Sequence, residues 1–200
     1  MKGVFQILRV YPGERKIFII LGLVFLCNAI ATQISSVAAV SGFLDDNGVK
    51  QLPIVWIIDM LFTLLTGGLQ SLIVDKFERS KLAKAMTIGF AGIFMVLWAM
   101  LYFHAPGGLT YGMMIIISEQ QWLFFPLVFW TLAQDAFSMA QSKRLFPLIS
   151  SLGLVGRLIG LSVVTAAPQI LKNSVTATEQ LLFLNVAIYI IAYFLVTFNG

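Results

Sequence analysis

Six long apolar stretches fill most of this 200-residue chain, and their length limits what it can fold into. An α-helix rises about 1.5 Å per residue, so roughly 20 apolar residues cross the hydrocarbon core of a bilayer, which is about 30 Å thick. Hydrophobic residues make up 59% of the chain and charged residues 11%, which leaves more apolar surface than a soluble domain of this size could bury. The sequence therefore predicts an all-α membrane protein with six transmembrane helices. The expected spans are residues 17–44, 52–74, 85–104, 111–134, 145–171 and 181–198.

The distribution of lysine and arginine predicts the orientation of these helices. Ten of the twelve such residues outside the spans lie before the first span, between the second and third, or between the fourth and fifth. Only Lys50 and Lys172 lie on the opposite side. Because cytoplasmic loops carry the excess of basic residues, we expect both chain ends in the cytoplasm, with residues 1–16 as a cytoplasmic leader. We expect the lipid bilayer around this chain to be the cell inner (cytoplasmic) membrane.

Few residues of the chain are suited to catalysis, metal binding or nucleic-acid binding. Cys27 is the single cysteine, which excludes an intrachain disulfide and a thiolate metal site. His104 is the single histidine, and its place at the outer end of the third span favours a role at the membrane interface. The motifs of serine hydrolases, phosphate-binding loops and zinc proteases are missing, and no dense basic block is present. We therefore expect no enzyme activity, no metal or cofactor, and no nucleic-acid partner.

Three ionisable residues lie inside the predicted spans: Asp59, Glu119 and Arg157. A charge at the bilayer centre costs at least about 2.5 to 3.5 kcal/mol on insertion scales, so such a residue normally faces a bundle interior or a wet cavity and has a partner. At about 1.5 Å per residue, Asp59 lies about 9 Å, Glu119 about 10 Å and Arg157 about 14 Å below the outer boundary. The three residues thus occupy one layer of the membrane.

Two main roles for Arg157 follow from this placement. In the first, a structural ion pair with Glu119 holds two helices in register. In the second, Arg157 is free part of the time to hold an anionic substrate, because its planar fork suits a carboxylate or a phosphate. A partner subunit or a lipid head group is a third candidate counter-ion for this arginine.

Polar and small residues at helical spacing mark the sides of the helices that we expect to face protein. The first span has a polar stripe of Asn28, Thr32 and Ser35 or Ser36. The second span has a polar stripe of Asp59, Thr63, Thr66 and Gln70. In the fifth span, Gly153, Gly156 and Gly160 form a seam of small residues that would let a neighbouring backbone approach closely.

Two segments carry a resemblance to a known family. The first is SLIVDKFERSK at residues 71–81, which resembles a degenerate form, without the two glycines, of the Gly-x-x-x-Asp-Arg-x-Gly-Arg-Arg loop of major facilitator transporters. The second is FWTLAQDAFSMAQSKRLFPLI at residues 129–149, followed by the glycine seam. It is similar to the segment from helix four to helix five in the ATP/ADP translocase-like branch of that superfamily, a branch of nucleotide transporters.

The resemblance implies an architecture and a set of functional residues. Such a transporter has twelve helices in two six-helix halves that rock around a central site, and this chain would supply one half of the bundle. The substrate-binding residues implied for the cavity are Asn28, Thr32, Ser36, Asp59, Glu119 and Arg157. The residues implied for a cytoplasmic gating network are Asp75, Arg79, Asp135, Lys143 and Arg144. Residues 31–40 have none of the charges that nucleotide exchangers of this branch tend to carry there.

Three functions remain open at this point. The first is half of a secondary transporter or antiporter for an anionic solute such as a nucleotide, partnered by a second six-helix half. The second is a transport-inactive module of the same fold that serves as a scaffold or subunit of a larger membrane complex. An enzyme or a channel is the third.

The expected topology can be tested by cysteine labelling in cells. In a background without Cys27, a membrane-impermeant thiol reagent added outside should label a cysteine at Asn47, because that loop is predicted to lie outside. It should not label a cysteine at Ser80. The reverse pattern would overturn the orientation.

Overall fold

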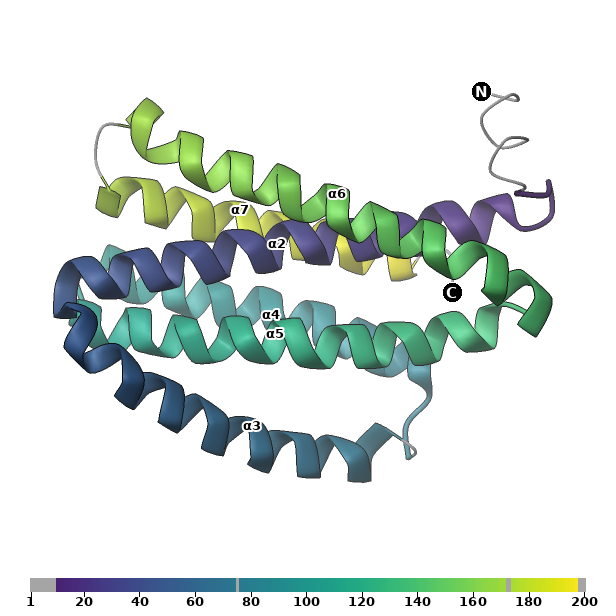
Figure 1. Cartoon of the computed structure of the whole chain (residues 1–200), viewed down its shortest axis with the longest axis horizontal. Helices are drawn as coiled ribbons and strands as arrows, with labels where there is room; N and C mark the ends of the chain where they lie inside the picture. The colour runs from purple at the N-terminus through teal and green to yellow at the C-terminus, as the bar shows by residue number, and fades with distance from the viewer. Residues whose placement is uncertain (1–9, 75, 172–173, 198–200) are drawn as a thin grey trace.

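The computed structural model describes residues 10–74, 76–171 and 174–197, and these residues form helices joined by turns (Figure 1). Each of the six long helices contains a stretch long and apolar enough to cross a membrane, which confirms the predicted all-helical fold class with six candidate spans. The helices are α2 (Arg15–Asn47), α3 (Leu52–Val74), α4 (Arg79–Tyr102), α5 (Gly107–Ala136), α6 (Met139–Leu171) and α7 (Ser174–Thr197), with the short 3-10 helix η1 (Val49–Gln51) between α2 and α3.

Several helices extend beyond the apolar stretches of the sequence. Both α4 and α6 begin six residues before the start expected from hydropathy, because their first turns are polar and basic. Glu78, next to the start of α4, pairs with Lys81 at 2.9 Å, and a carboxylate there interacts favourably with the helix dipole. Pro168 lies within the last turn of α6. Pro126 lies inside α5.

The centre of the bundle is formed by α2 and α5. Helix α2 packs against α5, α6 and α7, and α5 packs against α2, α3 and α4. About half of the apolar span of each is buried, 50% for α2 and 56% for α5, whereas only 6% of the corresponding span of α3 is buried. Helix α3 contacts α5 but leaves most of its surface uncovered, and Figure 1 shows it running along one edge of the bundle.

The helix contacts follow a repeating pattern. If α2, α3 and α4 are exchanged with α5, α6 and α7, the α2–α6 contact becomes the α5–α3 contact, and the α2–α7 contact becomes the α5–α4 contact. The α2–α5 and α4–α7 contacts map onto themselves. Among the described residues, the α6–α7 contact has no counterpart of note, and the α5–α3 contact is much less extensive than the α2–α6 contact to which it corresponds. Because each unit has three helices, the two units run in opposite directions through the bundle.

The most extensive contact in the bundle joins α2 to α6, and it depends on the predicted glycine seam. A Cβ atom at Gly156 would lie 2.8 Å from the backbone oxygen of Leu26, and one at Gly160 would lie 2.8 Å from that of Ile30. At Gly153 a Cβ atom would meet the ring of Phe25. Small residues therefore let the two backbones touch, as is typical of helix pairs in membranes.

We expect Gly156→Ala to lower the free energy of unfolding by about 1 to 3 kcal/mol, because the neighbouring backbone would have to move to admit one methyl group. Gly92→Ala is the matched control, since a Cβ at Gly92 meets nothing within 4 Å and alanine is the better helix former. Denaturant titration in detergent measures the free energy of unfolding of both variants. Equal stabilities of the two variants would show that the seam is not tightly packed.

Candidate functional site

A network of buried hydrogen bonds connects α2, α5 and α7 at the centre of the bundle. The hydroxyl of Tyr189 donates to Asn28 Oδ1 at 2.8 Å and accepts a hydrogen bond from Gln121 Nε2. The hydroxyl of Ser35 donates to Gln121 Oε1 at 2.8 Å. All four side chains are buried, so the polar stripe predicted on the first span does face protein. Asn185 adds a link, because its Nδ2 donates to the carbonyl of Ala31 at 3.0 Å.

A second set of hydrogen bonds holds α3 to α5. The amide of Gln120 donates through Nε2 to Thr63 Oγ1 at 2.7 Å and accepts through Oε1 from Thr66 Oγ1 at 2.7 Å. Asp59 lies one turn before Thr63 on the same side of α3, and its Oδ1 is buried without a hydrogen-bond partner. The predicted stripe of α3 therefore faces α5.

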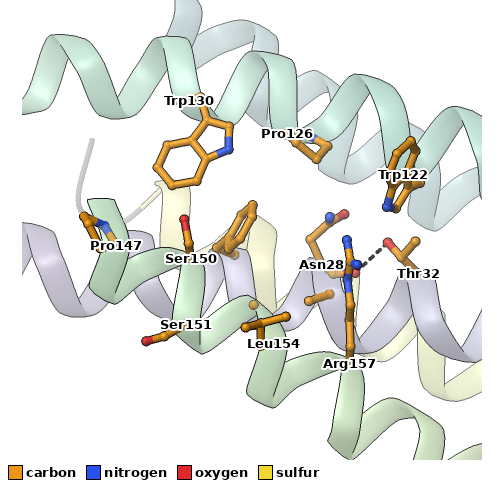
Figure 2. A pocket seen from close by; sticks show the side chains of 13 residues that line it. Asn28, Thr32, Trp122, Pro126, Trp130, Pro147, Ser150, Ser151, Leu154 and Arg157 are labelled. Atoms are coloured by element: carbon orange, nitrogen blue, oxygen red, sulfur yellow. Dashed lines mark hydrogen bonds between the residues drawn. The ribbon is translucent and has the colours of Figure 1, made fainter. Parts of the chain in front are cut away.

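A cavity of about 550 Å³, the main cavity, opens between α2, α5 and α6 (Figure 2). Its polar side chains include Asn28, Thr32 and Arg157, and Figure 2 shows the end of Arg157 close to the first two. The aromatic rings of Trp122 and Trp130 extend from α5 across the cavity toward α6. The main cavity thus combines one cation, several neutral polar groups and large apolar rings.

Two smaller cavities continue from the main cavity. The charged cavity, of about 240 Å³, is lined by Glu119 and Arg157 together with Thr32, Ser36 and Trp122. It shares Thr32, Trp122 and Arg157 with the main cavity.

The acidic cavity, of about 410 Å³, lies between α3 and α5 and is lined by Asp59 and Glu119. It shares Glu119 and Trp122 with the charged cavity, so Trp122 lines all three. All six residues that we assigned to substrate binding line at least one of these cavities.

The expected ion pair between Arg157 and Glu119 does not form. Both side chains are exposed to the charged cavity, but the ion pairs among the described residues are Arg79–Asp135, Lys81–Glu78 and Arg144–Glu14. The two residues do line one cavity, but the structural ion pair, the first of the two roles considered for Arg157, is not observed. Depth along each helix was the basis of the prediction, and depth does not determine the lateral distance between side chains.

Four of the residues assigned to the cytoplasmic network, Arg79, Asp135, Lys143 and Arg144, lie at the end of the bundle that holds the α3–α4 and α5–α6 connections. Arg79 Nη1 forms an ion pair with Asp135 Oδ1 at 2.5 Å, which ties the start of α4 to the end of α5. Arg144 pairs at 3.0 Å with Glu14, which our sequence analysis had not selected. Lys143 is exposed, and Asp75 lies outside the described residues.

Glu14 is the acceptor of a small cluster at this end. Its carboxylate accepts hydrogen bonds from Gln141 at 2.9 Å and from Arg144 at 3.0 Å, and the Arg144 guanidinium lies over the ring of Tyr11. Burial raises the pKa of Glu14, but the hydrogen bonds from Gln141 and Arg144 outweigh it and hold the pKa below its ordinary value. The cluster connects the start of α2 to α6.

Sequence reasoning missed several residues that line the cavities. Trp122 follows Glu119 by three positions, and Ser150 precedes Arg157 by seven, so helical periodicity would have placed each on the same face as the charged residue. Trp130 was noted only as part of a family motif. An aromatic residue in an apolar span gives no signal of its own, because lipid-facing and cavity-facing positions are both apolar.

The side chains that line these cavities offer several kinds of group to a bound solute. Within the described residues, no three His, Cys, Asp or Glu side chains are grouped closely enough to hold a metal ion. The arginine offers a fixed fork of donors, the carboxylates accept hydrogen bonds or carry a proton, and the tryptophan rings offer faces for stacking or for a cation.

Comparisons with protein-family models, with curated proteins and with solved structures found no match.

We expect Tyr189→Phe to lower the free energy of unfolding by about 1 to 3 kcal/mol, because it leaves buried groups of Asn28 and Gln121 without their partner. Tyr193→Phe, a turn later on α7 and only half-buried, is the control and should change stability little. Thermal unfolding of the detergent-solubilised variants measures the stability of each. Similar losses for both variants would show that the hydroxyl network contributes nothing specific.

Proposed function

We propose that this chain is one six-helix half of a secondary transporter of the major facilitator type, and that its cavities bind a small solute carrying an anionic group. A nucleotide is the example suggested by the resemblance to the ATP/ADP translocase-like branch. The proposal depends chiefly on one observation: the main and charged cavities hold an arginine that forms no ion pair with another described residue, within the membrane-spanning part of the bundle.

The position of Arg157 carries this interpretation because an arginine in a membrane span is costly. Such a residue normally faces protein or a water-filled cavity and is paired there. Here it lines two cavities with Thr32 and Trp122, and its carboxylate neighbour Glu119 is not in contact with it. A guanidinium that is exposed to a cavity and has no protein counter-ion is suited to binding an anionic group of a solute.

The arrangement of the helices supports the transporter half. Major facilitator halves are built from two three-helix units of inverted topology, and the contacts of α2, α3 and α4 are largely repeated by those of α5, α6 and α7. The main and charged cavities lie between α2, α5 and α6, the first, fourth and fifth spans, which line the central cavity in that fold. The uncovered α3 leaves an apolar surface for a second six-helix half.

The ion pairs at the basic end of the bundle suit a role in switching between conformations. The Arg79–Asp135 and Arg144–Glu14 pairs join different helices and are partly exposed, so they can break and re-form at a small cost in free energy. We propose that the bundle lies in the cell inner membrane. This end of the bundle and both termini then face the cytoplasm.

A scaffold role is the second candidate, and the uncovered surface of α3 favours it equally. The outward side chains of this helix are large and apolar, and a permanent partner subunit would bury them as well as a mobile second half would. In that case the cavities would be covered by the partner or by lipid, and water would not reach them.

Water access to the charged cavity distinguishes the two functions. In membranes with Cys27 replaced, we expect a charged water-soluble thiol reagent to label Ser36→Cys on the order of ten times faster than Leu158→Cys, because the first lines the charged cavity and the second faces outward from α6 beside Arg157. Vesicles containing the chain should also take up a labelled small solute that carries an anionic group, with ADP, inorganic phosphate and an amino acid as the probes. Equal labelling of the two cysteines together with no uptake would overturn the transporter and favour the scaffold.

A further inference from the structure

The charges that line the three cavities do not match those of a polyanion. Arg157 is the basic residue among the lining side chains described above, whereas Asp59 and Glu119 are both acidic. Glu119 lines the charged cavity with Arg157 and also the acidic cavity with Asp59. A solute with several negative charges would gain one attraction and meet two repulsions in surroundings of low dielectric constant, where both are strong.

We propose that the site takes a zwitterionic solute, an amino acid with a large apolar or aromatic side chain, whose carboxylate binds Arg157 and whose ammonium group binds Glu119. This inference rests on the proposed transporter function and names the substrate class of its site. It departs from the nucleotide suggested by the family resemblance.

The proposal rests first on the geometry of the charged cavity. Glu119 and Arg157 come from α5 and α6 and line one cavity of about 240 Å³ without forming an ion pair. Each charge therefore still needs a partner of opposite sign. A solute that carries both an anionic and a cationic group a few bonds apart satisfies both charges at once and leaves no net charge buried. A solute with one charge leaves the other protein charge unpaired.

The carboxylate of Asp59 strengthens the cationic half of this site. It lines the acidic cavity together with Glu119, so both carboxylates border that cavity. Negative charge is therefore concentrated around the position proposed for the ammonium group. Trp122, which lines all three cavities, presents an aromatic ring there, and a ring face attracts an ammonium group.

The main cavity provides room for the side chain of the solute. It continues from the charged cavity at Thr32, Trp122 and Arg157, and beyond them it is lined by apolar groups that include Phe25, Pro126, Trp130 and Leu154. Figure 2 shows Trp122, Pro126 and Trp130 along one side of α5, facing Leu154 and Ser150 on α6. A volume of about 550 Å³ is within the range of roughly 300 to 1,000 Å³ for small-molecule sites, so an aromatic side chain fits.

Binding of a matched set of probes to the full chain in lipid nanodiscs tests the proposal. Phenylalanine carries both charges, phenylpropanoate lacks the ammonium group, and phenylethylamine lacks the carboxylate, while the ring is the same in all three. We expect phenylalanine to bind with a Kd about tenfold or more below that of either analogue, because it alone pairs both Arg157 and Glu119. Quenching of tryptophan fluorescence or equilibrium dialysis measures the three values, and ADP is the polyanionic comparison.

Two variants assign the contacts. Glu119→Gln should remove the preference for phenylalanine over phenylpropanoate, and Arg157→Gln should remove the preference for phenylalanine over phenylethylamine. Glu179→Gln is the control, because this carboxylate lines a separate cavity formed by α4, α6 and α7, and it should leave all three Kd values unchanged. A residue with only a structural role would alter stability without changing these ratios. If a variant fails to fold, the wild-type series still decides.

Equal affinities of the wild-type chain for phenylalanine and phenylpropanoate, tighter binding of ADP than of phenylalanine, or no binding of any probe would overturn the zwitterion proposal. The transporter proposal would survive each of these results if the charged cavity is still labelled from water. A cavity sealed against the thiol reagent, with no uptake, would overturn both.

Discussion

The fold depends on a single constraint, that a polar group in the hydrocarbon of a bilayer must find its partner within the protein or in a water-filled cavity. The chain satisfies this requirement in two ways. Asn28, Ser35, Gln121 and Tyr189 satisfy one another in the core between α2, α5 and α7. The charged residues are instead gathered around cavities, where a solute or water can reach them. Asn28 joins the two sets, because it belongs to the hydrogen-bond network and also lines the main cavity.

The sequence was a good guide to features that depend on one helix at a time. Apolar length predicted the six spans, and helical spacing predicted the protein-facing side of α3 and the glycine seam of α6. What it did not predict depends on how two helices meet. The partner of Asn28 is a tyrosine 161 positions later, and no local pattern connects the two. The missing Arg157–Glu119 contact has the same origin, since residues at similar depth can be separated sideways by a whole cavity.

The two three-helix units differ in how their equivalent helices, α3 and α6, are attached to the bundle. Helix α6 packs on α2 through glycines that bring the backbones together, so its attachment consists of many short-range contacts. Helix α3, its counterpart in the pattern, packs on α5 with far less of its surface and relies on the bonds from Gln120 to Thr63 and Thr66. An element with few buried apolar contacts separates at a lower free energy than one that is closely packed. Helix α3 is therefore the element that a partner can most easily reposition.

Pro126 has a mechanical consequence for α5. A proline has no amide hydrogen, so the helical hydrogen bond from residue 126 to the carbonyl of Trp122 cannot form. A helix bends most easily where one of its backbone hydrogen bonds is missing. Both residues line the main cavity, so the weak point of this central helix coincides with the binding region. Glu119 lies on one side of this joint, and Asp135, with its ion pair to Arg79, lies on the other. Bending at the joint would couple the width of the cavity to the ion pair at the end of the bundle, with α5 acting as the lever between them.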